Sequence, residues 1–295
     1  MKESTKGFLS GLAAYSLWGI FPIYWKFLKE VNPFEIVFHR IIWSFLFLNL
    51  ILLLQRQLRE TLSYLKDKKI LKYFLLSSLM IGSNWFLYIW AVNTGKILET
   101  SLGYYMAPIF NVLLGRIVLK EKMTKGRAIS FTIVVIALLN MILGLNHLPW
   151  VSVILAITFS YYGFLRKNGK LGSIQGLFVE TLVMGIPSFL LIIYLSFIHK
   201  SSFLTINYKI DTLLILSGPA TAIPLLTFAY AARRLQFITL GIMQYIAPTI
   251  AFFIGAFLYK EPLNFKYLIT FILIWIALII YILDSYIIIY RYKKN

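Results

Sequence analysis

Apolar residues occur along this chain in stretches of about twenty, separated by short segments that carry most of the charged residues. About twenty consecutive apolar residues form a helix long enough to cross the hydrocarbon core of a bilayer. Because ten such stretches follow one another with short connections, the pattern predicts ten membrane-spanning helices and no separate soluble domain. The predicted spans are 7–27, 34–54, 71–92, 97–118, 127–145, 149–166, 174–196, 210–231, 238–259 and 267–289.

The segment 105–121 is repeated at 245–261. Six of the 17 aligned positions are identical, where composition alone predicts about one or two identities. The identical pairs, all at an offset of 140, are Tyr105 and Tyr245, Ala107 and Ala247, Pro108 and Pro248, Gly115 and Gly255, Lys120 and Lys260, and Glu121 and Glu261. A period of about half the chain indicates duplication and not a solenoid. The sequence therefore predicts two five-span repeats, 1–145 and 146–295, in one all-α membrane domain.

The distribution of basic residues predicts how the chain crosses the membrane. With a cytoplasmic N-terminus, 21 of the 29 Lys and Arg residues lie in cytoplasmic segments and seven in outer segments, which leaves Arg40 inside a span. Cytoplasmic loops are enriched in Lys and Arg, so both termini are expected in the cytoplasm. Five spans are an odd number, so the second repeat is expected to be inverted relative to the first. Inverted repeats are typical of secondary transporters, although some pores share them.

Composition narrows the classes of function. The chain is 60% hydrophobic and 14% charged, against about 25% charged in soluble domains. The net charge of +18 arises from short loops, where basic residues face anionic lipid, so the bilayer and not nucleic acid is the expected partner. The chain has no cysteine and three scattered histidines, so we expect no metal site, no catalytic residues and no cofactor. The succession of apolar spans leaves no room for the nucleotide-binding domain that an ATP-driven pump needs, so we do not expect such a pump.

The duplicated fourth and ninth spans carry prolines inside apolar helices, Pro108 and Pro248. A proline removes a backbone hydrogen bond and bends a helix, so both positions are predicted kinks. One interpretation is close packing around a structural kink, since Ala107, Asn111 and Gly115 share a face of small residues. The other is that the kinked segments turn carbonyl groups toward a central cavity.

Two charges occupy equivalent positions inside spans. Arg40 lies about seven residues into the second span and Glu180 about seven into the seventh, again at an offset of 140. A charge within the membrane usually faces a cavity or a partner. In one interpretation Arg40 snorkels and the two form a structural pair; in the other, Arg40 anchors a solute and Glu180 handles protons. For proton coupling, Glu35, Glu99 and Asp211 are equally compatible with the spacing.

Aromatic and amide residues in the spans form a further set, which includes Trp43, Tyr104 and Tyr161. Apolar pockets with a few polar groups suit amphipathic solutes, but Trp and Tyr near span ends also form interfacial belts. With Arg40 and Glu180, the residues that we select as candidates for a substrate cavity are Trp18, Asn84, Trp85, Tyr88, Asn93, Tyr105, Tyr162, Gln244 and Tyr245.

Several motifs resemble a known family. HRIIWS at 39–44, NWFLYIWAVNTG at 84–95, SLGYYMAP at 101–108, GLFVETL at 176–182 and QYIAPT at 244–249 are similar to RarD-type members of the EamA group, within the drug/metabolite transporter superfamily. The resemblance covers almost the whole chain. It implies a ten-span transporter of the bacterial cytoplasmic membrane, with spans one to four and six to nine around a central cavity and the other two peripheral. RarD-type proteins are often labelled chloramphenicol-resistance or chloramphenicol-sensitive permeases.

These observations favour a secondary transporter that moves a small metabolite or drug-like solute, outward, by alternating access between the repeats. Proton coupling is one expectation for its energy source, and the oligomeric state is left open. The alternatives are an importer or exchanger of amino-acid-like or nucleotide-like solutes on the same fold, and a membrane enzyme or non-transporting scaffold.

Overall fold

The computed structural model describes residues 3–143, 148–260 and 265–294, and every regular element in them is helical. The π-helical segments are labelled η. The elements are α1 (Glu3–Lys26), α2 (Pro33–Leu54), α3 (Leu58–Tyr64), α4 (Lys68–Asn93), α5 (Ile97–Leu113), η1 (Leu114–Val118), α6 (Lys125–Ile142), α7 (Trp150–Asn168), α8 (Ser173–Phe197), α9 (Tyr208–Ala232), α10 (Phe237–Met243), α11 (Ile246–Phe253), η2 (Ile254–Leu258) and α12 (Phe265–Lys294).

The all-α membrane fold that the sequence predicts is confirmed. Each predicted span coincides with one long helix or with consecutive short ones. Eight helical segments of the described chain are long and apolar enough to cross a bilayer. The other two predicted spans correspond to α5 with η1 and to α7, and their crossing of the membrane stays a prediction. The short helix α3, between the second and third spans, was not predicted.

Polar side chains mark where several helices begin. The carboxylate of Asp67 accepts hydrogen bonds from the backbone N–H groups of Lys69 and Ile70 at the start of α4. Thr124 caps α6 and Asn207 caps α9 in the same way. The first N–H groups of a helix have no partner within it, so these short polar side chains define where each apolar stretch becomes helical.

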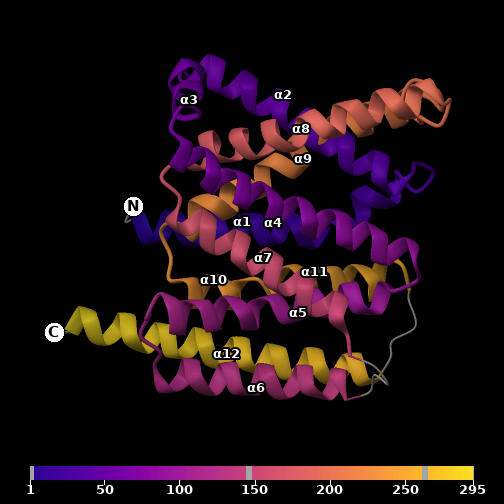
Figure 1. Cartoon of the computed structure of the whole chain (residues 1–295). Helices are drawn as coiled ribbons and strands as arrows, with labels where there is room; N and C mark the ends of the chain where they lie inside the picture. Colours follow the sequence, from indigo (N-terminus) through magenta and orange to yellow (C-terminus); the bar gives the residue numbers. More distant parts are fainter. Residues whose placement is uncertain (1–2, 144–147, 261–264, 295) are drawn as a thin grey trace.

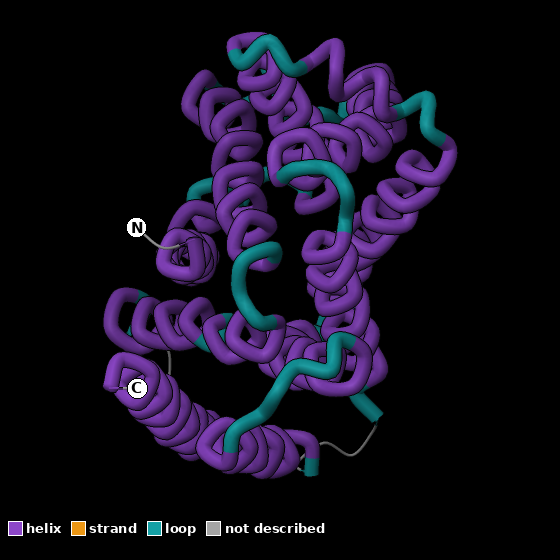
Figure 2. The backbone as a smooth tube through the Cα atoms, turned by 90° about the vertical axis from the view of Figure 1, so that its left-hand side faces the viewer, coloured by secondary structure: helices purple, strands orange, loops and turns teal. Residues whose placement is uncertain are grey.

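The long helices lie in one array, with α1 near its centre (Figure 1). The start of α1 and the end of α12 lie at the same end of the array (Figure 1), which is compatible with the predicted even number of crossings. The helices α6 and α12 pack against each other along one edge. Figure 2, turned by 90° from the view of Figure 1, shows the C-terminal end of the chain at the same edge of the bundle.

The duplicated segments have matching local structure. Both η1 and η2 are π-helical and five residues long, and they begin 140 residues apart. Lys120 and Lys260, which follow them, both have φ of 53°. Packing matches as well, because α1 contacts α9 as α7 contacts α4, and α1 contacts α11 as α7 contacts α5. Glu261 lies outside the described residues. We propose that the units 1–145 and 146–295 are inverted repeats.

The prolines of the two repeats have different surroundings. Pro108 lies within the continuous helix α5, whereas the ninth predicted span is interrupted at Gln244 and Tyr245, between α10 and α11. Pro248 then lies in the first turn of α11, where the missing N–H leaves no unpaired carbonyl within the helix. The sequence predicts a kink at Pro248, whereas the structure interrupts the helix before that proline, at Gln244 and Tyr245.

Helices α2 and α9 approach each other closely at Gly218. A side chain there would place its Cβ 2.6 Å from the backbone nitrogen of Ser44, closer than van der Waals contact allows. The Ser44 hydroxyl donates a 2.9 Å hydrogen bond to the Gly218 carbonyl across the same contact. Small residues let membrane helices pack this closely. The contact also fixes Thr221, one turn further along α9, opposite Arg40.

Candidate functional site

A cavity of about 580 Å³ lies among α1, α2, α4, α5, α7, α9 and α11. Phe159 is the α7 contribution, and Gln244 lines it from the break before α11. No residue of α6, α8 or α12 lines the cavity, so the expected contribution of the seventh span is not observed in the described chain. The described lining includes Ser101 near the start of α5 and, around the connection of α1 to α2, the residues Trp25, Leu28, Lys29, Val31 and Pro33. The cavity therefore occupies the half of the molecule on that side.

Arg40 extends from α2 into this cavity. Its Nε donates a 2.9 Å hydrogen bond to Oγ1 of Thr221. The guanidinium carbon lies 4.8 Å from the ring centroid of Trp25 and 4.9 Å from that of Trp85. Both are cation–π distances. None of the ion pairs among the described residues includes Arg40, so the group is held in place by neutral partners.

The cavity has a positive charge balance. Arg40 and Lys29 are the charged residues of its described lining, which contains no carboxylate. The remaining polar contributions come from Asn84, Gln244, Thr221 and hydroxyl groups, and the rest of the wall is apolar or aromatic. Such a wall attracts negative charge and accommodates an apolar solute body.

The selected aromatic candidates Trp18, Trp85, Tyr88 and Tyr105 line the cavity. Trp18 is packed against Phe159 in an edge-to-face pair with ring centroids 5.8 Å apart. Tyr88 makes a similar pair with Tyr104 at 5.7 Å. These rings are therefore oriented by aromatic neighbours that also line the cavity.

Two amides line the cavity and also hold helices together. Nδ2 of Asn84 donates to the Leu155 carbonyl at 2.8 Å and to Thr158 Oγ1 at 2.9 Å, which joins α4 to α7. Oε1 of Gln244 accepts a 2.8 Å hydrogen bond from Nδ2 of Asn111. Each amide thus finds the partner that burial in a membrane protein requires.

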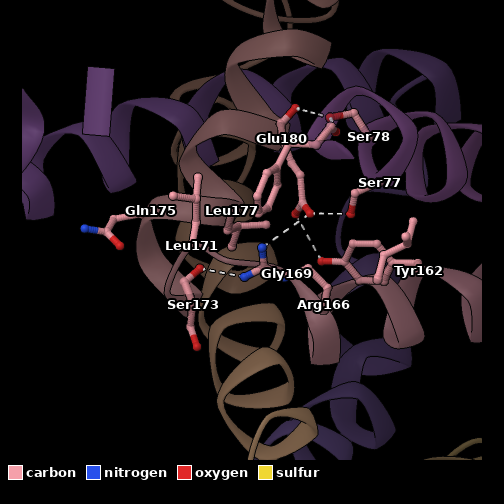
Figure 3. Close-up of polar contacts among 12 residues, drawn as sticks. Ser77, Ser78, Tyr162, Arg166, Gly169, Leu171, Ser173, Gln175, Leu177 and Glu180 are labelled. Carbon is pink, nitrogen blue, oxygen red and sulfur yellow. Dashed lines mark hydrogen bonds and ion pairs between the residues drawn. The ribbon is translucent and has the colours of Figure 1, made fainter. Parts of the chain in front are cut away.

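Glu180 lies apart from the cavity, in a fully buried polar cluster (Figure 3). Its Oε1 accepts a 2.5 Å hydrogen bond from Ser77 and lies 3.4 Å from Nη1 of Arg166. Its Oε2 accepts from the Tyr162 hydroxyl at 3.3 Å. The buried carboxylate therefore pairs with Arg166 of α7 and not with Arg40.

Arg166 is the member of this cluster that sequence reasoning missed. The distribution of basic residues places Arg166 in a cytoplasmic connection, but the structure buries the residue, which is 2% exposed. Its Nη2 donates to the Ser173 carbonyl at 2.9 Å, and its guanidinium lies 5.7 Å from the ring centroid of Phe74. Its position 14 residues before Glu180, across one short connection, is the signal that could have suggested a pair.

The other selected residues differ in where they lie relative to the cavity. Tyr162 is buried in the Glu180 cluster, and Tyr245 is buried with its hydroxyl donating to the carbonyl of Tyr105 at 3.0 Å. Pro108 is in α5 but not in the lining, whereas Pro248 lines the cavity. Asn93 belongs to α4, and its side chain lies outside the described residues.

The remaining acidic candidates for proton coupling have structural partners. Glu35 is fully buried, and its Oε1 accepts from Ser201 Oγ at 2.8 Å and lies 3.8 Å from Nε2 of His39. Glu99 accepts from the N–H of Val151 at the start of α7. Asp211 accepts from a backbone N–H of the loop before α9. No group of three His, Asp or Glu residues in the described chain could hold a metal ion.

The end of the molecule opposite the cavity is tied together by polar contacts. Oε1 of Glu121 accepts from the N–H of Phe237 at 2.6 Å, and its Oε2 accepts from that of Ile238 at 2.9 Å. Nζ of Lys167 lies 3.9 Å from Glu121 and donates to the Ala232 carbonyl at 3.1 Å. A carboxylate at a helix N-terminus is favourable, so Glu121 fastens the loop after η1 to α10. We call these contacts the Glu121 closure.

Comparison with known proteins gives consistent similarities. The pattern of the EamA-like transporter family matches residues 5–143. Protein RarD of Escherichia coli K12 is 35% identical over 287 residues, covering 96% of each chain. The uncharacterized transporter YojE of Bacillus subtilis is 38% identical over 95% of this chain and 94% of its own. A Pseudomonas aeruginosa relative named chloramphenicol-sensitive protein RarD is 28% identical over 97% of this chain and 96% of its own.

A solved structure extends the likeness to the fold. It is described only as a crystal structure of a protein, and it superposes with a TM-score of 0.70 over 94% of this chain and 96% of that one. The two sequences are 15% identical, so this likeness concerns the arrangement of helices and not the chemistry of the cavity.

Proposed function

Because this chain belongs to the EamA-like transporter family, as a RarD-type member of the drug/metabolite transporter superfamily, we propose that it is a secondary transporter of a small metabolite or drug-like solute. It is a multi-pass protein of the bacterial cytoplasmic membrane, and we propose that both termini face the cytoplasm. The proposed direction is outward, and the proposed mechanism is alternating access between the two repeats.

The observation that carries this proposal is the cavity around Arg40. A charged side chain within a membrane is expensive and usually serves a pathway or a partner. Arg40 has neutral protein partners in the described chain, and it faces a space of about 580 Å³. Pockets of this volume hold small organic molecules. A solute that enters the cavity would supply the polar or negative partner that Arg40 lacks.

The closure at the opposite end supports alternating access. The cavity reaches the connection of α1 to α2, whereas the Glu121 closure holds the loop after η1 together with α7, α9 and α10 at the other end. Inverted repeats can adopt two nearly equivalent packings, one open to each side. With both termini in the cytoplasm, as proposed, we assign this structure to the state open to the outside. In the proposed cycle, the Glu121 closure breaks when the cavity opens inward.

Proton coupling is the energy source that we propose to test first. Glu180 is a candidate because it is a buried carboxylate between α4, α7 and α8. Its pairing with Arg166 equally suits a structural role. We propose no enzymatic activity, since the selected polar residues are arranged as helix contacts and cavity walls.

The test is uptake into proteoliposomes that contain the purified chain, using a pooled metabolite extract with chloramphenicol added. Accumulation above equilibrium only when a pH gradient is imposed would establish a proton-coupled transporter. Equilibration without accumulation would instead indicate a facilitator or an exchanger. If no solute moves in either condition while the protein remains folded, the transporter proposal is wrong.

A further inference from the structure

We infer that the solute carried by this protein is an amphipathic organic monoanion, bound with its carboxylate at Arg40 and its flat apolar body against Trp85 and Tyr88. This inference rests on the proposed function, because it names the class of solute for the same cavity. It is carried by the charges of the wall, by the way in which Arg40 is held, and by the shape of the remaining lining.

The charge balance favours an anion over a cation or a zwitterion. Arg40 and Lys29 line the cavity, and no carboxylate is found in its described lining. A solute ammonium group would therefore lie near two positive charges without a negative partner, which is unfavourable where the local dielectric is low. A solute with one negative charge neutralises Arg40 and leaves the exposed Lys29 at the side of the cavity that includes the α1–α2 connection.

The guanidinium of Arg40 is oriented before a solute arrives. Trp25 and Trp85 lie within 5 Å of it, at 4.8 and 4.9 Å, and Thr221 accepts the Nε hydrogen bond. The terminal Nη groups have no acceptor among the described residues, and the side chain is partly exposed to the cavity. An arginine fork binds a planar carboxylate through two parallel hydrogen bonds. Holding the fork in advance lowers the ordering cost of binding.

The rest of the wall selects against strongly polar solutes. Trp18, Trp85, Tyr88, Tyr104 and Phe159 contribute large ring surfaces. Asn84 already donates to two acceptors on α7, and the Gln244 oxygen is already occupied by Asn111. A sugar or a polyanion would bring more polar groups than this wall can satisfy, at a cost for each unpaired group. One carboxylate on a flat apolar body matches both the charge and the lining.

The experiment compares three probes that share a naphthalene body: 1-naphthylacetate, its neutral isostere 1-naphthylacetamide, and the cation 1-naphthylmethylamine. Binding to the purified full-length chain in detergent is measured by calorimetry. Because hydrogen bonds between two charged groups are stronger than those to a neutral group, the acetate is expected to bind roughly tenfold or more tightly than the amide. The amine is expected to bind more weakly than the amide.

Three variants assign the preference to Arg40. Arg40→Gln is expected to abolish the preference for the acetate while it still binds the amide, which shows that the variant is folded. Arg40→Lys keeps the charge but loses the fork, so it is expected to retain part of the preference. Arg59→Gln removes an exposed arginine from α3 and is expected to leave all three affinities unchanged.

Equal binding of acetate and amide, no acetate binding at millimolar concentration, or a preference that survives Arg40→Gln would each overturn the inference. Its failure is separable from that of the proposed function. Solute movement in proteoliposomes without an anion preference in binding would reject the inference alone. An Arg40-dependent anion preference without movement of any solute would reject the transporter proposal alone.

Discussion

The buried pair of Glu180 and Arg166 allows a quantitative prediction about what holds α7 and α8 together. The perturbation is a double-mutant cycle that consists of Glu180→Gln, Arg166→Gln and the double variant. Both side chains are buried, at 0% and 2% exposure, with Oε1 and Nη1 3.4 Å apart. Each single substitution leaves one buried charge without its opposite partner, and the double substitution leaves none.

The magnitude follows from this geometry. At 3.4 Å, the Coulomb attraction is about 5 kcal/mol for an effective dielectric constant near 20, and desolvation of both charges offsets much of it. Removing one partner of a buried pair costs about 3–5 kcal/mol. Ser77 and Tyr162 can still donate to residue 180 in every variant, so we expect about 3 kcal/mol for each single substitution. The double variant is expected to lose less than the sum, with a coupling energy of about 2–3 kcal/mol.

The assay is reversible unfolding of the purified chain in mixed micelles with increasing SDS. The control cycle uses Glu3 and Arg234, an exposed pair at 2.7 Å whose side chains are 60% and 27% exposed. Water and salt screen exposed pairs, so the control coupling is expected to be much smaller than that of Glu180 and Arg166. Additive effects at Glu180 and Arg166, or a coupling no larger than the control, would refute the reasoning.

Two further predictions concern packing and the Glu121 closure. Gly218→Ala brings a methyl group against the backbone of α2 and is expected to lower the free energy of unfolding by about 1–3 kcal/mol. The control Gly185→Ala, whose added Cβ has nothing within 4 Å, is expected to change it by no more than about 0.5 kcal/mol. Equal effects of the two substitutions in SDS unfolding would contradict the close approach of α2 and α9. Glu121→Gln weakens the charge-assisted hydrogen bonds from the N–H groups of Phe237 and Ile238. Hydrogen exchange of these two amides is therefore expected to accelerate about tenfold. An unchanged exchange rate would show that Glu121 does not hold the first turn of α10.

The helices were predictable from sequence because their signal is local. An apolar stretch of suitable length must become helical in lipid to satisfy its own backbone, and the observed helix ends lie close to the predicted ones. Arg40 was identifiable for a related reason, since a charge inside such a stretch is conspicuous. The matching geometry at Lys120 and Lys260 likewise follows from residues that the duplication preserved.

The partners of the charges could not be predicted in the same way. Which side chains meet depends on how each helix is rotated about its axis and where it lies beside its neighbours. Arg166 is near the end of α7, so it was counted with the loop charges, yet the turn into α8 returns the chain and buries it against Glu180. The neutral partners of Arg40 come from three other parts of the chain, Trp25, Trp85 and Thr221. The separation between the cavity and the Glu180 cluster appears only in three dimensions.

The central claim is that the cavity opens to one side at a time through equivalent parts of two inverted repeats. The chain has no cysteine, so a single introduced cysteine is the one thiol that a maleimide can label. Val92 lines the cavity, and Ala232, 140 residues later, is fully buried beside the Glu121 closure.

The deciding measurement is the labelling of Val92→Cys and Ala232→Cys by a membrane-impermeant maleimide added to either side of the membrane. The account predicts that Val92→Cys reacts only from outside and Ala232→Cys only from inside, and that conditions which speed one reaction slow the other. Reaction of both from the same side, or rates that rise together, would contradict it.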